Sequence, residues 1–464
     1  MKKSLLFLAA FIISTIVSEA QICFQKTYGG PFFEMASCVR QTSDGGYIVV
    51  GNAPATSGNG KDICLIKTNE YGIEQWTKKI GEIYDEAGSC VRQTTDGGYI
   101  ISGTIFNDIS GFSLQYYFVK TNANGDTVWT RKYGFGQKGA TSIYQTIDGG
   151  YVFTGVSVDN SQHCVGKLNS NGDLLFEKYY GFLSTIGSSI QQTTDGNLII
   201  SGSKGLDFCL VKLDSIGDTL WTRTYGNTDH EYGSFVQQTS DGGFIIAGRK
   251  LCDTLSDKTY IVKTDNNGDT LWTKSYQGVC GGGPHCIQQT TDGGYIIGDI
   301  SCTYWQDTLY LRTVKMNSNG DSLWTNTFGG SIYYGIGCFV QQTTDGGYII
   351  SGSTSILGAG NTDFILIKTN DNGIVGVHND LSEIDSTIIE VFPNPANNFI
   401  NINSNTEIKN LTIFNLEGRK IISKNISGKT ETLDVAQLNE GVYFAVINFA
   451  DNTTATKKIV IIRN

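Results

Sequence analysis

The sequence predicts an all-β protein: a seven-bladed β-propeller over residues 21–375, followed by a small C-terminal β-sandwich over residues 388–464. Three observations lead to this fold. A motif of the form Gln-Thr-Thr-Asp-Gly-Gly-Tyr recurs seven times, each repeat carries the signals of four strands, and the repeat ends near residue 375. Only 17% of the residues are charged, and the 57 glycines favour turn-rich β-structure over helices.

The repeat has the length of one propeller blade. Its central aspartate recurs at spacings of 52, 52, 47, 46, 51 and 53 residues, and periods of about 40–50 residues are typical of propellers and solenoids. The seven aspartates are Asp44, Asp96, Asp148, Asp195, Asp241, Asp292 and Asp345.

Four strands, here named a to d in chain order, are predicted in each repeat. In the last copy "GCFVQQT" is strand a, the Asp-Gly turn follows, and "YIISG" is strand b. After a variable loop, "DFILIKT" is strand c, and "NDNG" forms a second tight turn. In other copies strand d follows, as in "GDTLWTKSY". Four strands per period make one blade.

Strand d is missing from the last repeat, and its counterpart stands at the other end of the chain. The segment Ile22–Gly30, "ICFQKTYGG", has the strand d pattern. We therefore expect it to pair with the strand that ends at Lys368, which closes the ring and removes the free sheet edges.

The order of strands assigns the two faces of the propeller. The a–b and c–d turns, which hardly vary, lie on one face. The b–c and d–a loops, which differ from blade to blade, lie on the other. Variable loops on a uniform scaffold are where specificity usually lies, so we expect ligand binding on the second face, here called the loop face.

The first 20 residues read as a signal peptide. Lys2 and Lys3 precede an apolar stretch from Leu5 to Val17, and Ser18-Glu19-Ala20 supplies small residues for cleavage after Ala20. We expect no membrane span, because no internal apolar run reaches 18 residues. The net charge of −10 argues against nucleic acid as a partner.

Ten of the eleven cysteines fall into two groups. Seven occupy recurring repeat positions and are expected to be buried as small apolar side chains: Cys38, Cys64, Cys90, Cys164, Cys209, Cys286 and Cys338. Cys252, Cys280 and Cys302 lie in predicted loops and are the better disulfide candidates. Because there is no Cys-x-x-Cys motif, a zinc site is not expected.

The C-terminal segment has a different pattern. Residues 376–387 are predicted to be a linker, and four stretches of alternating strands follow. The ordered stretches "VFPNPANNFINI", "LTIFNLEGRKI", "LNEGVYFAVI" and "KKIVIIRN" resemble the type A C-terminal sorting domain of the bacterial type IX secretion system. The resemblance implies an Ig-like β-sandwich over 388–464, the type IX machinery as its partner, and a protein that is secreted or displayed on the outer cell surface.

Several recurring residues are interpreted as structural. Each repeat aspartate is expected to form an ion pair with the lysine that ends strand c. The strand d tryptophans are expected to pack between blades. Segments such as 265–269, "DNNGD", place oxygen atoms at alternate positions as calcium loops do. Their glycine stands at the wrong place for such a loop, so a hairpin turn is expected, and no metal or other cofactor is predicted except a weak case for Ca²⁺.

Two sets of side chains are candidates for function on the loop face. His230, Glu231 and His285, together with Asp85 and Glu86, lie in d–a loops and offer acid–base groups near the channel mouth. Tyr304 and Trp305 depart from the repeat in a b–c loop and offer a stacking surface for a ligand.

These observations predict a binding or adhesion module that uses the loop face on a glycan or a protein. The alternative is a propeller enzyme, a polysaccharide hydrolase or lyase that uses the acids and histidines of the d–a loops. Convergence of His230, Glu231 and His285 on one pocket would favour the enzyme, and since no other grouping of acids and histidines is close in sequence, we expect binding rather than catalysis.

Overall fold

The computed structural model describes residues 21–55, 60–82, 84–106, 113–134, 138–157, 162–180, 183–184, 189–226, 230–251, 257–279, 284–302, 309–331, 337–375, 389–415, 419–450 and 454–463. The predicted signal peptide (1–20) and linker (376–387) lie outside these ranges. The chain divides into two compact units between residues 376 and 377. Within the described residues no helix is long and apolar enough to cross a membrane.

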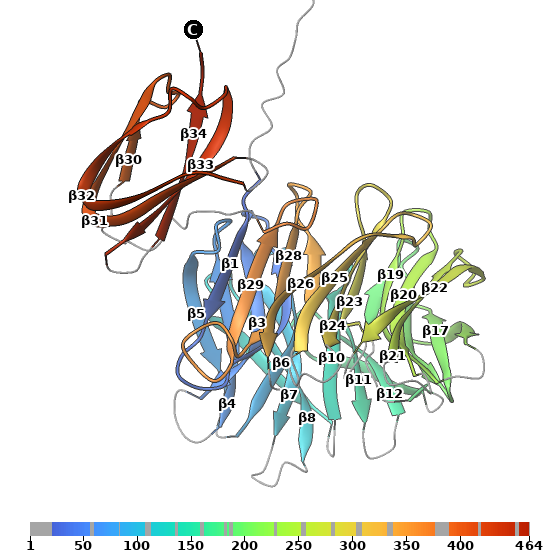
Figure 1. Cartoon of the computed structure of the whole chain (residues 1–464). Helices are drawn as coiled ribbons and strands as arrows, with labels where there is room; N and C mark the ends of the chain where they lie inside the picture. Colours follow the sequence, from blue (N-terminus) through green and yellow to red (C-terminus); the bar gives the residue numbers. More distant parts are fainter. Residues whose placement is uncertain are drawn as a thin grey trace, which may run out of the picture. The chain divides into compact units, whose positions relative to one another are not determined.

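Seven antiparallel sheets of four strands form the first unit (Figure 1). Strands a are β2 (Met35–Gln41), β6 (Glu86–Gln93), β10 (Lys138–Gln145), β15 (Ile190–Gln192), β19 (Glu231–Gln238), β23 (Cys286–Gln289) and β27 (Phe339–Gln342). Strands b are β3 (Tyr47–Pro54), β7 (Tyr99–Phe106), β11 (Tyr151–Ser157), β16 (Leu198–Lys204), β20 (Phe244–Lys250), β24 (Tyr295–Cys302) and β28 (Tyr348–Thr354).

The outer half of each sheet consists of the other two strands. Strands c are β4 (Lys61–Thr68), β8 (Leu114–Thr121), β12 (Gln162–Leu168), β17 (Asp207–Leu213), β21 (Asp257–Thr264), β25 (Leu309–Met316) and β29 (Asp363–Thr369). Strands d are β5 (Glu74–Ile80), β9 (Thr127–Tyr133), β13 (Leu174–Tyr180), β18 (Thr219–Tyr225), β22 (Thr270–Val279), β26 (Ser322–Ser331) and β1 (Phe24–Tyr28). The sheet of the fourth blade also contains the short strand β14 (Leu183–Ser184).

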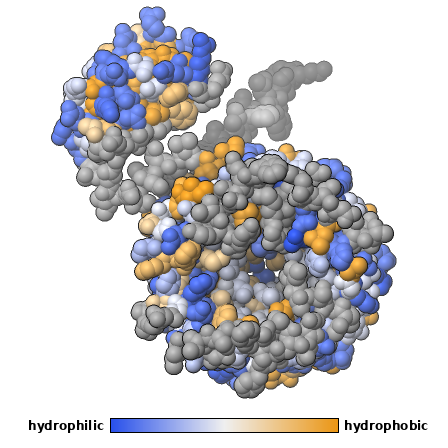
Figure 2. Space-filling view, turned by 60° about the horizontal axis from the view of Figure 1, so that its bottom comes forward, coloured by the Kyte–Doolittle hydropathy of each residue, from blue (hydrophilic) through white to orange (hydrophobic). Residues whose placement is uncertain are grey.

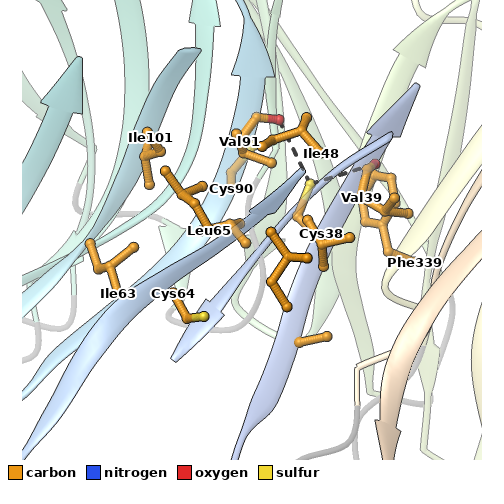
Figure 3. Close-up of a cluster of buried hydrophobic side chains, with 14 of the residues drawn as sticks. Cys38, Val39, Ile48, Ile63, Cys64, Leu65, Cys90, Val91, Ile101 and Phe339 are labelled. Carbon is orange, nitrogen blue, oxygen red and sulfur yellow. Dashed lines mark hydrogen bonds between the residues drawn. The ribbon is translucent and has the colours of Figure 1, made fainter. Parts of the chain in front are cut away.

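The middle strands of each blade carry the core. In the first blade, β3 and β4 are almost continuously buried, whereas β5 alternates between exposed and half-buried side chains. A strand covered by blades on both faces must be apolar throughout, and an outer strand can present every second side chain to water. Figure 3 shows the packing between the first two blades, where Cys38 lies beside Cys90 and Val91 of the neighbouring sheet.

Aromatic rings join successive blades as predicted. The strand d tryptophan meets the first residue of strand b in the next blade edge to face, with ring centroids 5.6–6.0 Å apart. The pairs are Trp76–Tyr99, Trp129–Tyr151, Trp221–Phe244, Trp272–Tyr295 and Trp324–Tyr348. Edge-to-face pairs of this kind contribute about 0.5–1.5 kcal/mol beyond the area that they bury.

The predicted closure of the ring is confirmed. β1 pairs antiparallel with β29, and Phe24 lies opposite Lys368 (Figure 1). Phe24 also takes the place of a strand d tryptophan, because its ring packs against Tyr47 of the first blade at 6.0 Å. The N-terminal strand therefore completes the seventh blade and joins it to the first.

A ring of glutamines ties the blades together at the inner edge. The last glutamine of each strand a accepts a hydrogen bond from a backbone N–H in the turn of the preceding blade. The ring includes the junction of the last and first blades, where Gln41 Oε1 accepts from Thr344 N at 2.9 Å. Because all seven junctions carry this bond, the propeller is a closed ring.

Each repeat aspartate forms the predicted ion pair within its own blade. The pairs are Lys67–Asp44, Lys120–Asp96, Lys167–Asp148, Lys212–Asp195, Lys263–Asp241, Lys315–Asp292 and Lys368–Asp345, at 2.5–2.9 Å. The lysine stems are buried or nearly so, and the carboxylates stay largely exposed. This arrangement fits a structural role for the ring of lysines.

The Asn-Gly segments form the predicted hairpin turns. Asn122 Oδ1 accepts hydrogen bonds from the backbone N–H groups of Asn124 and Asp126, each at 2.9 Å. Gly125 between them has φ of +78°, a conformation that glycine adopts without strain. The asparagine oxygen that resembles a calcium ligand in sequence is therefore used inside the turn.

The described cysteines agree with the interpretation from the repeat. All seven cysteines at repeat positions are free and buried, and so is Cys23. Cys252 and Cys280 lie outside the described residues, as does the side chain of Cys302.

The second unit is a small β-sandwich made by long strands that serve both layers. Its strands are β30 (Ile389–Phe392), β31 (Phe399–Asn415), β32 (Lys420–Asp434), β33 (Gly441–Phe449) and β34 (Thr454–Ile461). The first part of β31 pairs with β30 and the second part with β33, and its register with β32 breaks between Asn403 and Ile408. The core of this unit is mostly aliphatic, with Ile400, Leu411 and Ile447, and also contains the rings of Tyr443 and Phe449.

Candidate functional site

A pocket occupies the part of the central channel that opens toward the loop face. Its volume is about 390 Å³, and it is lined by residues of the strands a and, in blades four, six and seven, by residues that directly precede these strands. Figure 2, in which the loop face comes forward, shows the hollow at the centre of the ring of blades. A second, smaller cavity of about 130 Å³ continues along the channel toward the turn face.

Two arginines stand where the two cavities meet. Arg40 of β2 and Arg92 of β6 line both of them, as do Phe235 and Phe339. The guanidinium of Arg40 lies over the Phe339 ring at 4.2 Å, and that of Arg92 lies over the Tyr144 ring at 4.8 Å. Stacking on an aromatic ring fixes the plane of a guanidinium and leaves its edge for hydrogen bonds.

Neither arginine has a carboxylate partner within the described part of the chain. Arg92 Nε donates to Ile143 O at 2.8 Å, and Arg40 Nη1 donates to Val39 O at 3.3 Å. Arg40 Nε is buried and has no hydrogen-bond partner. Burial and, to a smaller extent, the positive charge of Arg40 lower the pKa of Arg92.

The position of the arginines follows from an interruption of a second glutamine network. In blades four to seven the residue four places before the repeat aspartate is glutamine, and its Oε1 accepts from the backbone of the next blade. These glutamines are Gln191, Gln237, Gln288 and Gln341. The same position holds Arg40, Arg92 and Tyr144 in blades one to three. The channel thus has a uniform amide side and a cationic, aromatic side.

Hydroxyl groups and one histidine line the rest of the pocket. Ser37, Ser89, Ser142, Ser189, Ser234 and Thr141 contribute from five blades. His285 lies in the pocket at the start of the sixth blade, with its side chain exposed to the hollow. The protein around the channel lowers the pKa of His285, so we treat this ring as neutral at pH 7.

The structure separates the predicted acidic residues from this pocket. Asp85 Oδ1 accepts from the backbone of Lys61 at 3.0 Å, between the first and second blades. Glu86 is fully buried beside it, and its Oε1 accepts from Glu82 N at 3.0 Å. Burial raises the pKa of Glu86 to about 7. Neither side chain is part of the lining of the channel pocket.

His230 and Glu231 lie at another junction. Glu231 is fully buried and forms an ion pair with Lys250 at 2.8 Å. His230 is half-buried, its ring lies near Tyr232, and its Nδ1 is buried without a hydrogen bond. Neither residue lines the channel pocket with His285. Among the described residues no group of three His, Cys, Asp or Glu side chains could hold a metal ion.

Tyr304 and Trp305, the predicted stacking pair, lie outside the described residues. Sequence reasoning overlooked Arg40 and Arg92, although a signal was present. When the repeats are aligned on their aspartates, the position four places earlier changes from glutamine to arginine in two blades only. A charged residue on a strand that faces the channel would have marked the site.

The arrangement can bind an anion. Two guanidiniums with free donors, a ring of hydroxyls and a neutral histidine provide many hydrogen-bond donors and no carboxylate. Arginine forks match the geometry of carboxylate, sulfate and phosphate groups. A pocket of this size lies within the range of about 300–1,000 Å³ that holds small ligands.

Comparison with known proteins identifies the C-terminal unit. Residues 390–462 match the family of secretion system C-terminal sorting domains. No curated protein matches the chain. The Dos1 propeller is similar in structure, with 8% identity, a TM-score of 0.47, and coverage of 74% of this chain and 94% of that chain. The propeller domain of the Trilobed protease from Pyrococcus furiosus has 11% identity, a TM-score of 0.39, and coverage of 75% and 98%.

One similar structure is PorZ, described as a bacterial surface component of the type IX secretion system of Porphyromonas gingivalis. Its identity is 12% and its TM-score 0.41, and the alignment covers 94% of this chain. This chain spans only 60% of the length of that protein. Because residues 390–462 match the sorting-domain family, the β-propeller is a cargo of the type IX secretion system, exported to the cell surface or released.

Proposed function

We propose that the exported propeller is a binding module that holds an acidic ligand in the channel pocket, entered from the loop face. The observation that carries this proposal is the pair Arg40 and Arg92, which line the pocket and have no carboxylate partner in the part of the chain that the structure describes. The body of the protein is acidic, with a net charge of −10 for the chain. The local cationic pair favours an anionic group that fits the pocket. The acidic surface around it repels large polyanions.

An acidic sugar is the ligand class that fits the pocket best. The serine and threonine hydroxyls can hydrogen-bond to sugar hydroxyls, Phe235 and Phe339 can pack against a sugar ring, and the arginines can hold its carboxylate or sulfate. The predicted signal peptide and the sorting domain would bring such a module to the cell surface or beyond. An acidic segment of a protein is the other ligand of the same chemistry.

The test is a binding isotherm of the mature chain with oligogalacturonates, sulfated oligosaccharides and neutral oligosaccharides of equal length. Arg40→Gln with Arg92→Gln should weaken binding of the acidic oligosaccharide by about 100-fold or more, because each charge-assisted hydrogen bond contributes about 1.5–3 kcal/mol. Arg223→Gln is the matched control, since Arg223 is 41% exposed on an outer strand. Equal binding by the double variant and the control would refute the proposal.

A lyase for acidic polysaccharides is the second candidate, and His285 is the observation that favours it. This residue provides a possible base in the pocket that holds the two arginines. Formation of an unsaturated sugar from polygalacturonate, abolished in His285→Gln, would support it. Binding without turnover would leave the module as a binding protein.

A further inference from the structure

Pairs of acidic side chains lie where neighbouring blades meet on the loop face. One acid comes from the beginning of strand c of a blade, the other from the beginning of strand a in the next blade, and a glycine follows strand d between them. Three junctions have this set: Asp363, Gly29 and Glu34; Asp62, Gly81 and Glu86; Asp207, Gly226 and Glu231.

At the junction that closes the ring, both carboxylates are buried, and only one oxygen of each accepts a hydrogen bond. Glu34 is 6% exposed and Asp363 is 1% exposed. Glu34 accepts a backbone hydrogen bond from Gly30, and Asp363 Oδ2 accepts from Gly360 N at 3.1 Å. The other oxygen of each, Glu34 Oε2 and Asp363 Oδ1, is buried and has no hydrogen-bond partner.

These two oxygens approach the same point. A Cβ placed on Gly29 would lie 2.1 Å from Asp363 Oδ1 and 3.2 Å from Glu34 Oε2. The second junction repeats this geometry, because a Cβ on Gly81 would lie 2.1 Å from Asp62 Oδ1 and 2.6 Å from Glu86 Oε2. Glu86 Oε2 is likewise buried without a hydrogen bond. Only a residue without a side chain leaves the two carboxylates this close.

The nearest lysines are engaged elsewhere. Lys79 lies close enough to influence Glu34, but its Nζ donates to Pro54 O at 2.7 Å. Lys132, which influences Glu86, forms its ion pair with Glu82 at 2.6 Å. Two ionised carboxylates in a buried site repel each other strongly unless a positive charge lies between or beside them.

The third junction shows how the chain itself meets this need. Glu231 lies opposite Lys250 in the adjacent strand, and Lys250 Nζ is 2.8 Å from Glu231 Oε1. Glu231 Oε2, which faces Gly226, is buried without a hydrogen bond, so Lys250 supplies the compensating charge and leaves that oxygen unpartnered. Glu86 lies opposite Ile105, and the first blade has Ala53 at the corresponding place. The glutamate of the pair therefore has a lysine opposite it at one junction and an apolar residue at that place at the other two.

We propose that the junctions of Glu34 with Asp363 and of Glu86 with Asp62 bind Ca²⁺. The side-chain atoms that could coordinate an ion at these junctions are carboxylate oxygens, and a hard divalent cation prefers oxygen ligands. Gly29 and Gly81 are exposed, so an ion can reach the buried oxygens past them. At the first junction the ion would join the N-terminal segment to the seventh blade, so that Ca²⁺ outside the cell would strengthen closure of the ring.

The test compares the mature chain in Ca²⁺, in Mg²⁺ at equal ionic strength, and in a chelator. Calorimetric titration should give two Ca²⁺ per chain, one in Glu34→Gln, one in Glu86→Gln, and none in the double variant. The urea midpoint of tryptophan fluorescence should rise with Ca²⁺ in the parent and stay unchanged in the double variant. Glu231→Gln is the matched control, and it should keep the full response because Lys250 occupies its junction.

Each alternative result would overturn the proposal. The parent could have the same urea midpoint in Ca²⁺ and in chelator, and Glu34→Gln and Glu86→Gln could both be more stable than the parent. This result would mean that the two carboxyl groups of each pair share a proton. An equal rise with Mg²⁺ would mean charge screening. A Ca²⁺ response that survives in the double variant would place the ion elsewhere. Loss of the response only in Glu231→Gln would reverse the assignment of the junctions.

Discussion

Phe24 is expected to control whether the ring stays closed. Its side chain is 2% exposed, its ring packs edge to face on Tyr47, and it lies against the backbone at Gly72. Phe24→Ala removes a fully buried ring from the strand that completes the seventh blade, which costs about 3–5 kcal/mol. The lost edge-to-face pair contributes about 0.5–1.5 kcal/mol of that cost. Since domains of this kind are stable by about 5–15 kcal/mol, the loss is large.

Tryptophan fluorescence measures this effect on the propeller alone, because all six tryptophans lie between residues 76 and 324. Urea unfolding of Phe24→Ala should show a lower midpoint with an unchanged slope. The control is Phe32→Ala, because Phe32 is 59% exposed and its loss should change stability by less than about 0.5 kcal/mol. If the two variants unfold at the same midpoint, β1 does not close the ring and the reasoning is wrong.

Four further predictions concern the blades, the loop face, the tail and the ring of ion pairs. Trp272→Ala should lower the free energy of unfolding by about 3 kcal/mol, the low end for a tryptophan because the ring is only partly buried. Trp305→Ala should weaken ligand binding with little change in the urea midpoint. Removal of residues 377–464 should leave the fluorescence unfolding curve unchanged and abolish export in a type IX host. Burial raises the pKa of Asp241, but hydrogen bonds such as that from Lys263 outweigh it and lower the pKa to about 2. The stabilisation from this ion pair is therefore present above about pH 4 and is lost toward pH 2. Asp241→Asn should lower the urea midpoint near neutral pH and leave it unchanged at pH 2.

The repeat determined the architecture from sequence alone. Seven Asp-Gly turns, seven lysines that end strand c and a strand d displaced to the N-terminus predict seven blades, their ion pairs and the pairing of β1 with β29. These features are local or periodic, and a pattern that recurs at fixed spacing shows which residues share a structural place. The sorting domain was equally readable, because its motifs stand in a fixed order.

The functional site depends on contacts between residues that are far apart in the chain. Arg40 and Arg92 are 52 residues apart and occupy a place where four other blades have glutamine. Only the closed ring shows that both face one pocket and that no carboxylate among the described residues neutralises them. Glu86 lies at one blade junction and His230 and Glu231 lie at another, and both glutamates are fully buried.

The same distinction holds for the acid pairs. In sequence, Glu34 and Asp363 are separated by almost the whole propeller. Ring closure brings them together beside Gly29 and removes them from water. The sequence by itself determined the blades, their number and the export of the protein, since these follow from periodic and contiguous patterns. Which charges are paired, and which are left for a ligand or an ion, was decided only by the tertiary structure, because the energy of a charge depends on its burial and on neighbours brought close by folding.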